Sequence, residues 1–295
     1  MTNTILVTGA TGNIGSGLVP SLLAHGATVR ALVRDPLKAA DLAEAGVEVV
    51  QGDLDKPETL DAAFDGVDKV FLLTPPNPNQ VTQAHNGIVA ARRAGVAHLV
   101  RLSAGAIPVT VDAAARVTRQ HAVIDAELAT SGLAYTILRP HFFVQNLLIA
   151  ARSVAADAAL YLPAKDADLG MIDVRDVVEA ATAVLTEDGH EGQTYVLTGP
   201  RSISFHDVAQ ALSTALGTEV QYVDVPAEAA REAMIGMGVS EWVSDALNEY
   251  FQVFSEGLGD FTTPAVEALT GHAARSIDTF ASDFAAAIEP AAQPA

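Results

Sequence analysis

The sequence has no cysteine, one tryptophan and few basic residues in its 295 positions. Without cysteine the protein has no disulfide, thiolate nucleophile, Cys-ligated zinc or iron–sulfur cluster. It contains 17 Lys and Arg against 36 Asp and Glu, a formal net charge of −19. Because that charge repels both a phosphate backbone and an anionic membrane surface, neither nucleic acid nor a membrane is an expected partner. A chain without disulfides fits a reducing cytoplasm, which is the location we expect.

The first 29 residues also lack charged side chains, and Arg30 is the first. A secretory signal would need a cationic segment before its apolar core, and none is present here. Several glycines and Pro20 interrupt the apolar residues, so the stretch is not typical of a membrane span. It predicts instead a strand, a glycine turn and a helix.

Apolar runs alternate with amphipathic stretches through the first half of the chain. We expect strands at residues 4–8, 28–33, 47–51, 69–73, 98–103 and 135–139, with a helical stretch after each of the first five. This alternation predicts an α/β fold of the Rossmann type, a doubly wound parallel sheet with helices on both faces.

The second half loses this rhythm. Short strands are expected at residues 159–162, 170–173, 193–197 and 220–223, and Ser204 and Asp207 have the spacing of a helix capping box. We predict a first domain over residues 1–150, a smaller C-terminal α/β lobe over residues 151–289 that is integrated with it, and a tail over residues 290–295.

A glycine-rich segment lies between the first expected strand and the first expected helix. Glycines at every third position allow a tight turn, close approach of a pyrophosphate and close packing of helix on strand. The helix N-terminus then offers unpaired N–H groups to the phosphates. The segment predicts a dinucleotide-binding loop, and the alternative is a strand–helix turn that binds nothing. Its candidate ligands are Gly9, Thr11, Gly12, Asn13, Ile14 and Gly15.

The end of the second strand bears on the choice between NADP and NAD. Asp35 has nearly the spacing of an acidic residue that holds the adenosine ribose of NAD. Arg34 precedes it, and its guanidinium can bind a 2′-phosphate, with Lys38 as a second cation. We favour NADP (NADPH), and NAD is the alternative cofactor. The alternative interpretation of Arg34 is a solvated loop residue that binds no phosphate. Asp53 and Leu54 follow the third strand, where an adenine ring would lie.

Seven segments spread along the chain resemble the atypical short-chain dehydrogenase/reductases, and within them the NmrA-like branch. That branch includes NAD(P)H-quinone oxidoreductases and NADP-sensing regulators. The resemblance implies a Rossmann-type domain, a small C-terminal lobe and a substrate between them. The segments are residues 8–15 (TGATGNIG), 33–36 (VRDP), 52–54 (GDL), 101–104 (RLSA), 131–140 (SGLAYTILRP), 172–177 (IDVRDV) and 269–271 (LTG).

The sequence departs from the larger family at its catalytic signature, a Tyr followed four residues later by a Lys. Val117 and His121 occupy these positions here. Without the tyrosine acid, reduction of an isolated ketone to an alkoxide is disfavoured, whereas a quinone yields a far less basic anion. A His in place of the Lys resembles the quinone-reductase branch.

Further candidate residues follow the later strands. We name Ser103 and His121 as catalytic candidates, and Phe143, Asn146 and Trp242 as candidates for the acceptor pocket. The structural alternatives are a capping hydroxyl for Ser103, a satisfied structural histidine for His121, and core or lobe packing for the aromatic residues. No metal site is expected, because the eight histidines show no paired spacing. Candidates for contact with the nicotinamide half of the cofactor are Leu73, Thr74, Pro75, Ser103, Pro140, His141 and Phe142.

The sequence thus predicts an NAD(P)H-dependent oxidoreductase that transfers hydride to a quinone-like or other conjugated small-molecule acceptor. The alternative is a non-catalytic NADP(H)-binding redox sensor that acts through a protein partner. A homodimer is compatible with either function.

Overall fold

The computed structural model describes residues 3–105 and 107–288. Its centre is a parallel sheet of seven strands in the order β3-β2-β1-β4-β5-β6-β9. The sheet confirms the predicted Rossmann-type fold, and the six strands expected in the first half are all present. The strands are β1 (Thr4–Thr8), β2 (Thr28–Val33), β3 (Glu48–Gln51), β4 (Lys69–Leu72), β5 (His98–Leu102), β6 (Tyr135–Pro140) and β9 (Gln193–Leu197).

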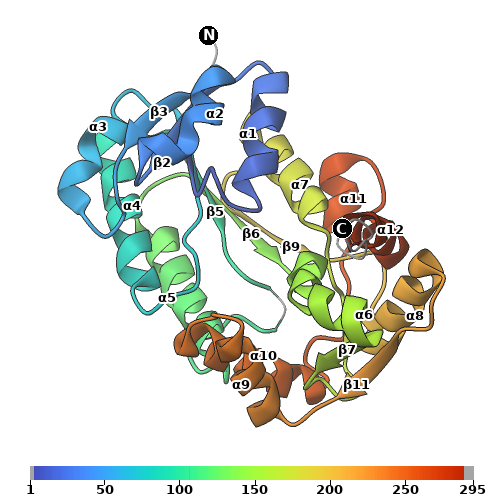
Figure 1. The fold of residues 1–295 in the computed structure, drawn as a ribbon. Coiled ribbons are helices and arrows are strands. Elements are labelled where there is room, and N and C mark those ends of the chain that lie inside the picture. Colours follow the sequence, from blue (N-terminus) through green and yellow to red (C-terminus); the bar gives the residue numbers. More distant parts are fainter. Residues whose placement is uncertain (1–2, 106, 289–295) are drawn as a thin grey trace.

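Helices cover both faces of this sheet (Figure 1). Helices α1 (Gly15–Ala24), α7 (Val174–Thr186) and α11 (Ala265–Thr270) pack on one face, where their apolar residues form one core cluster. Helices α3 (Asp61–Phe64), α4 (Gln80–Ala94) and α5 (Arg116–Thr130) pack on the other face around a second cluster. Because both faces are covered, strands such as β1 and β4 are almost continuously apolar. The short helices η1 (Pro36–Ala39), α2 (Ala40–Glu44) and η2 (Pro57–Thr59) lie in the connections around β3.

The remaining elements form a smaller lobe below and to the right of the sheet in the view of Figure 1. In this lobe β7 (Ala159–Leu162) pairs in parallel with β11 (Gln221–Asp224), and β8 (Asp168–Leu169) pairs antiparallel with β10 (Ile203–Ser204). A third apolar cluster fills its interior. Its helices are η3 (Val144–Ala150), α6 (Ala151–Asp157), α8 (Phe205–Leu216), α9 (Ala227–Gly236), α10 (Glu241–Ser255) and α12 (Ile277–Ile288).

Residues from both sides of position 150 contribute to the main sheet and its covering helices. Strand β9, at the edge of the sheet, and helix α7, which packs on it, both come from the second half of the chain. At the start of α8, the predicted capping box is present, with the Ser204 and Asp207 side chains bonded to each other's backbone N–H groups. No helix within the described ranges is long and apolar enough to cross a membrane.

The prediction of a strand at residues 170–173 is wrong. The regular pairing ends with β8 at Leu169, and the next residues hydrogen-bond to several separate segments. Gly170 N–H donates to the Gly259 carbonyl, whereas Ile172 N–H donates to the Phe142 carbonyl. A Cβ on Gly170 would lie 2.2 Å from the Phe261 carbonyl oxygen, so the backbone here packs directly against a neighbouring backbone segment. Because the hydrogen-bond partners belong to separate segments, residues 170–173 form no regular strand pairing.

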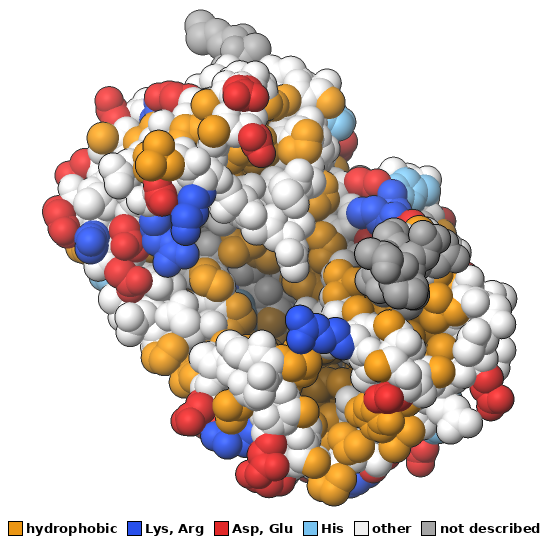
Figure 2. Space-filling view, in the orientation of Figure 1, with side chains coloured by type: hydrophobic (Ala, Val, Ile, Leu, Met, Phe, Trp, Pro, Cys, Tyr) orange, Lys and Arg blue, Asp and Glu red, His pale blue; other side chains and the backbone are white. Residues whose placement is uncertain are grey.

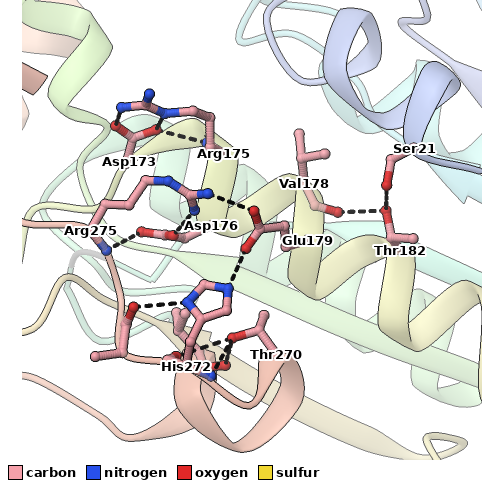
Figure 3. Close-up of polar contacts among 12 residues, drawn as sticks. Ser21, Asp173, Arg175, Asp176, Val178, Glu179, Thr182, Thr270, His272 and Arg275 are labelled. Atoms are coloured by element: carbon pink, nitrogen blue, oxygen red, sulfur yellow. Dashed lines mark hydrogen bonds and ion pairs between the residues drawn. The ribbon is translucent and has the colours of Figure 1, made fainter. Parts of the chain in front are cut away.

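An ion-pair cluster fastens the segment between α11 and α12 to the start of α7 (Figure 3). The Arg275 guanidinium binds both Asp176 and Glu179, and its backbone N–H donates to Asp176 as well. Asp176 is fully buried. His272 adds a ring contact to Glu179, with Nε2 at 2.7 Å from Oε2. The cluster ties the C-terminal part of the lobe to the main sheet.

His272 makes part of this attachment dependent on pH. Its two ring nitrogens contact the Ala273 carbonyl and the Glu179 carboxylate, and these acceptors raise the pKa of His272 above its ordinary value. The stabilisation is therefore complete below the unfolded pKa of about 6.5 and is lost as pH rises through the raised folded value. We expect His272→Ala to lower the thermal unfolding midpoint more at about pH 6 than at about pH 9.

Thermal unfolding at the two pH values measures this difference. His206→Ala is the control, since its ring lies 3.8 Å from Asp166, too far for a hydrogen bond. An equal loss for His272→Ala at both pH values would show that the imidazolium does not contribute.

Candidate active site

A cleft of about 1050 Å³ opens at the carboxyl ends of the central strands. The strand order reverses between β1 and β4, and such a switch point is where open α/β sheets bind their ligands. In Figure 2 the molecule is hollowed at the centre of this face, between the sheet part and the smaller lobe, with hydrophobic side chains around the hollow. One end of the cleft meets the glycine-rich loop, and the other meets aromatic residues of the smaller lobe.

The glycine-rich loop forms the turn from β1 into α1. Gly9 has φ +67°, a left-handed conformation that other residues rarely adopt, and the Gly12 N–H closes the turn onto its carbonyl at 3.0 Å. Gly15 begins α1 directly over this turn. A Cβ on Gly15 would lie 2.3 Å from the Gly9 carbonyl oxygen and 2.5 Å from Ala10 Cα. The sequence Gly-x-x-Gly-x-x-Gly therefore places the start of the helix against the strand end, closer than any side chain would permit.

The N-terminus of α1 faces the cleft with unused donors. The N–H groups of Asn13 and Ile14 form no hydrogen bond with the part of the chain that the structure describes. No side chain caps the helix, and its first turn contains no acidic residue. Free amides, a positive helix end and a first turn without a carboxylate suit the pyrophosphate of a dinucleotide.

Two cations and one carboxylate stand at the end of β2 on the cleft wall. The Arg34 and Lys38 side chains are exposed and form no ion pair or hydrogen bond within residues 3–105 and 107–288. The Asp35 carboxylate accepts a hydrogen bond from Leu37 N–H at 3.1 Å, so it caps η1. This end of the cleft thus has two unpaired positive charges for a phosphate, while its nearest carboxylate already has a local partner.

The loops after β3 and β4 complete the nucleotide side. Asp53 Oδ1 accepts from Asp55 N–H at 3.0 Å, and Leu54 contributes an apolar surface to the cleft. Thr8 holds the ends of β1 and β4 together, since its hydroxyl donates to the Leu73 carbonyl and accepts from the Leu73 N–H, both at 2.8 Å. Thr74 follows and is buried.

Beneath the floor of the cleft lies a buried network centred on Asp125 of α5. Its carboxylate accepts hydrogen bonds from Arg101 of β5 at 2.6 Å and from Arg139 of β6 at 2.9 and 3.1 Å. Ser103 Oγ is 2.9 Å from the same carboxylate and donates to it. The hydroxyl proton of Ser103 is thus committed to Asp125, which leaves this oxygen as an acceptor towards the cleft.

His121 is the fifth member of this network and lines the cleft one helical turn from Val117. Its Nδ1 lies 2.9 Å from Arg101 Nη2, and the side chain is 4% exposed. Burial and the charges of Arg101 and Arg139 hold the pKa of His121 well below its ordinary value. The ring is therefore neutral at physiological pH.

The segment after β6 connects the cleft to the lobe. His141 donates from Nε2 to the Gly259 carbonyl at 3.0 Å and accepts the Phe142 N–H on Nδ1 at 2.7 Å. Burial lowers the pKa of His141 to about 4, so this ring is a neutral tie between two backbone segments. Phe142 lies edge-on to Phe254, and Phe143 packs against the core under the sheet. Both also line the cleft, so each combines a packing role with contact to the cavity.

Helix α10 supplies an apolar wall of the cleft. Val243, Leu247, Tyr250 and Phe254 recur along one face of this helix and line the cleft. Tyr250 Oη lies 3.1 Å from Thr118 Oγ1, and burial raises the pKa of the phenol to about 12. These residues recur at helical spacing in the sequence, but that spacing alone does not show which neighbour the apolar face meets.

Two predicted site residues lie outside the cleft lining. Gly15 is buried behind the loop, where it permits the close packing described above. Trp242 lies under the Arg116 guanidinium, 5.7 Å from the ring centroid. Helical spacing places Trp242 on the side of Asp245 and Glu249, which bind the same arginine, so it is turned away from the cleft residues of α10.

The other predicted site residues meet in this one cavity. Within the described parts of the chain, no three His, Asp or Glu side chains are grouped to hold a metal ion. The predicted residues that line the cleft are Gly9, Thr11, Gly12, Asn13, Ile14, Arg34, Lys38, Asp53, Leu54, Leu73, Thr74, Pro75, Ser103, His121, Pro140, His141, Phe142, Phe143 and Asn146.

Comparisons with known proteins agree with this architecture. The sequence model of the NmrA-like family matches residues 1–282. An NAD(P)H azoreductase from Xenophilus azovorans is 40% identical over 284 residues, which are 96% of this chain and 98% of the azoreductase. The triphenylmethane reductase of Citrobacter sp., solved with NADP(H), is 29% identical with a TM-score of 0.85, covering 96% of this chain and 99% of that one. The NADPH-dependent quinone oxidoreductase of Escherichia coli, solved with NADPH, is 27% identical with a TM-score of 0.86, covering 95% and 99%.

Proposed function

The chain belongs to the NmrA-like family, and on that premise we propose that it is an NADPH-dependent reductase of quinone-like or other conjugated aromatic acceptors. The observation that carries this proposal is the continuity of the cleft. It runs from the glycine-rich loop and the side chains of Arg34 and Lys38 to a wall of apolar and aromatic side chains. The cleft therefore offers surfaces for a dinucleotide and for a flat acceptor end to end in one cavity.

The residues present fit NADPH. The Asn13 and Ile14 amides would bind the pyrophosphate, and Arg34 with Lys38 would bind the 2′-phosphate. Asp53 and Leu54 would border the adenine, while Thr74, Pro75, Pro140 and His141 would border the nicotinamide half. When bound, NADPH supplies a hydride, which carries two electrons and one hydrogen.

The side chains at the acceptor end of the cleft favour a reaction whose product anion is weakly basic, because such an anion needs little help from a protein acid. The cleft-facing residues of α5 are Val117 and His121, so no Tyr and Lys pair stands on this helix face. An alkoxide from a ketone has a conjugate pKa of about 16, against about 10 for a phenolate, a difference of about 8 kcal/mol in proton affinity. A quinone that accepts the hydride becomes a phenolate-type anion, and a proton from water completes the hydroquinone.

The apolar wall supports an aromatic acceptor. Phe142, Phe143 and Phe254 offer ring surfaces, while Val117 and Leu247 add aliphatic contacts. The similar proteins carry the names azoreductase, triphenylmethane reductase and quinone oxidoreductase, which share a conjugated acceptor. The wall would hold such a molecule against the nicotinamide and exclude water, so that proximity and orientation supply much of the rate.

The test is oxidation of NADPH with a panel of acceptors, followed by the loss of NADPH absorbance. We expect turnover with a naphthoquinone or an azo dye to exceed that with cyclohexanone by at least about 100-fold, because only the conjugated acceptors delocalise the product charge. Equal rates with cyclohexanone would contradict the proposal. Tight NADPH binding without turnover of any acceptor would also contradict it and favour the redox-sensor alternative.

A further inference from the structure

The contact between Arg101 and His121 fixes which ring nitrogen of the histidine carries its proton. A guanidinium has five N–H donors and no acceptor, so His121 Nδ1 must accept the hydrogen bond at 2.9 Å from Arg101. A neutral imidazole carries one proton, which must then be on Nε2. Arg101 thereby removes the tautomer in which Nδ1 is protonated.

The Nε2–H group is available to the cleft. His121 lines the cleft, and Nε2 has no hydrogen-bond partner within the described ranges. Other polar atoms without a partner, such as His98 Nδ1, are fully enclosed by protein, but His121 Nε2 is not. This nitrogen is therefore accessible from the cavity. The neighbouring Ser103 hydroxyl donates to Asp125. At this place in the cleft wall, His121 is therefore the donor and Ser103 the acceptor.

We infer that Arg101 is a positioning residue, which holds His121 as a neutral Nε2–H donor aimed at the negative charge that develops on the acceptor. This inference rests on the proposed function. The charged groups packed around the ring are Arg101 on β5, Arg139 on β6 and Asp125 on α5, which together carry one net positive charge. A donor polarised by an adjacent cation in a water-poor site stabilises a developing oxyanion without giving up its proton.

Arg101 is suited to this role because it stays fixed and charged. It is 1% exposed, and Asp125 holds its Nη1 at 2.6 Å while Nη2 contacts the histidine. Burial lowers the pKa of Arg101 to about 10, so the guanidinium remains charged at neutral pH. The His121 side chain lies between the Arg101 guanidinium and the cleft.

The first test reads the tautomer directly in the wild-type protein. Long-range ¹H–¹⁵N spectra of histidine-labelled protein distinguish the two neutral tautomers and the imidazolium, and His121→Gln assigns the signals by their loss. We expect the Nε2–H tautomer throughout the range of about pH 5.5 to 8. A protonated Nδ1, or an imidazolium within that range, would overturn the inference. This result does not depend on turnover, so it separates failure of the inference from failure of the proposed function.

The second test is a double-mutant cycle with Arg101→Met and His121→Phe. We expect Arg101→Met alone to lower kcat with a naphthoquinone by at least about tenfold, with little change in the KM for NADPH. In the His121→Phe background the same substitution should change kcat by less than about twofold. Arg101→Lys, which keeps a charged donor, should restore part of the rate. Equal losses in both backgrounds would show that Arg101 acts only on the fold and would overturn the inference.

Discussion

Gly15→Val is expected to weaken NADPH binding by at least about 50-fold, equivalent to more than about 2 kcal/mol. The new side chain would meet the Gly9 carbonyl oxygen, because a Cβ on Gly15 already falls 2.3 Å from it. The atoms of Gly9 and Ala10 that the added Cβ would meet belong to the backbone, so the loop itself must move. The Asn13 and Ile14 amides would then leave the positions from which they would bind the pyrophosphate. Fluorescence titration of the NADPH nicotinamide measures the change.

The matched control is Gly236→Ala at the end of α9. No atom lies within 4 Å of the Cβ that this substitution adds, and the residue has no left-handed φ. We expect its NADPH affinity to equal that of the wild type. Circular dichroism verifies that both variants are folded. An unchanged NADPH affinity for folded Gly15→Val would show that the loop does not hold the cofactor.

Arg34→Ala is expected to weaken NADPH binding by about 5- to 150-fold, or about 1–3 kcal/mol, and to change NADH binding little. The loss of affinity should be selective for NADPH, because only NADPH carries the 2′-phosphate that the Arg34 guanidinium at the end of β2 would bind. Lys38 remains in this variant and would retain part of the attraction. Dissociation constants for NADPH and NADH, measured in the same buffer because salt screens the contact, give the comparison.

Arg92→Ala serves as the charge-matched control. Arg92 is exposed in the last turn of α4 and does not line the cleft, so its loss changes the net charge without touching the proposed phosphate site. We expect its affinity for both cofactors to stay within about twofold of the wild type. Equal losses of NADPH and NADH affinity in Arg34→Ala would remove this residue from the 2′-phosphate role.

Local patterns were sufficient to predict the strands and helices of the first half. The apolar run of β1, the glycines after it and the helical spacing of α1 each specify their structure within a few residues of chain. Residues 170–173 show the limit of such reasoning. They have a strand-like composition, but Gly170 is enclosed by backbone from residues 259–261, and that contact comes from nearly a hundred positions away.

The same contrast applies to the site. The place of the glycine loop and of Arg34 in the cleft lining could be predicted because each directly follows a strand end. The position of Trp242 outside the cleft lining could not be predicted, for the opposite reason. A helix has one periodicity but several faces, and the packing of Arg116 against Asp245 and Glu249 decided which face of α10 turned away from the cleft.

The sequence by itself determined the fold class, the glycine-rich turn and the family, because these follow from period, glycine spacing and motifs along a continuous stretch. Only the tertiary structure decided the chemistry of the cleft floor. Arg101, Asp125 and Arg139 come from three separate elements, and they meet only when β5, β6 and α5 pack together. The proton positions on Ser103 and His121 follow from those contacts, since a hydrogen bond is set by the partner that folding brings within about 3 Å.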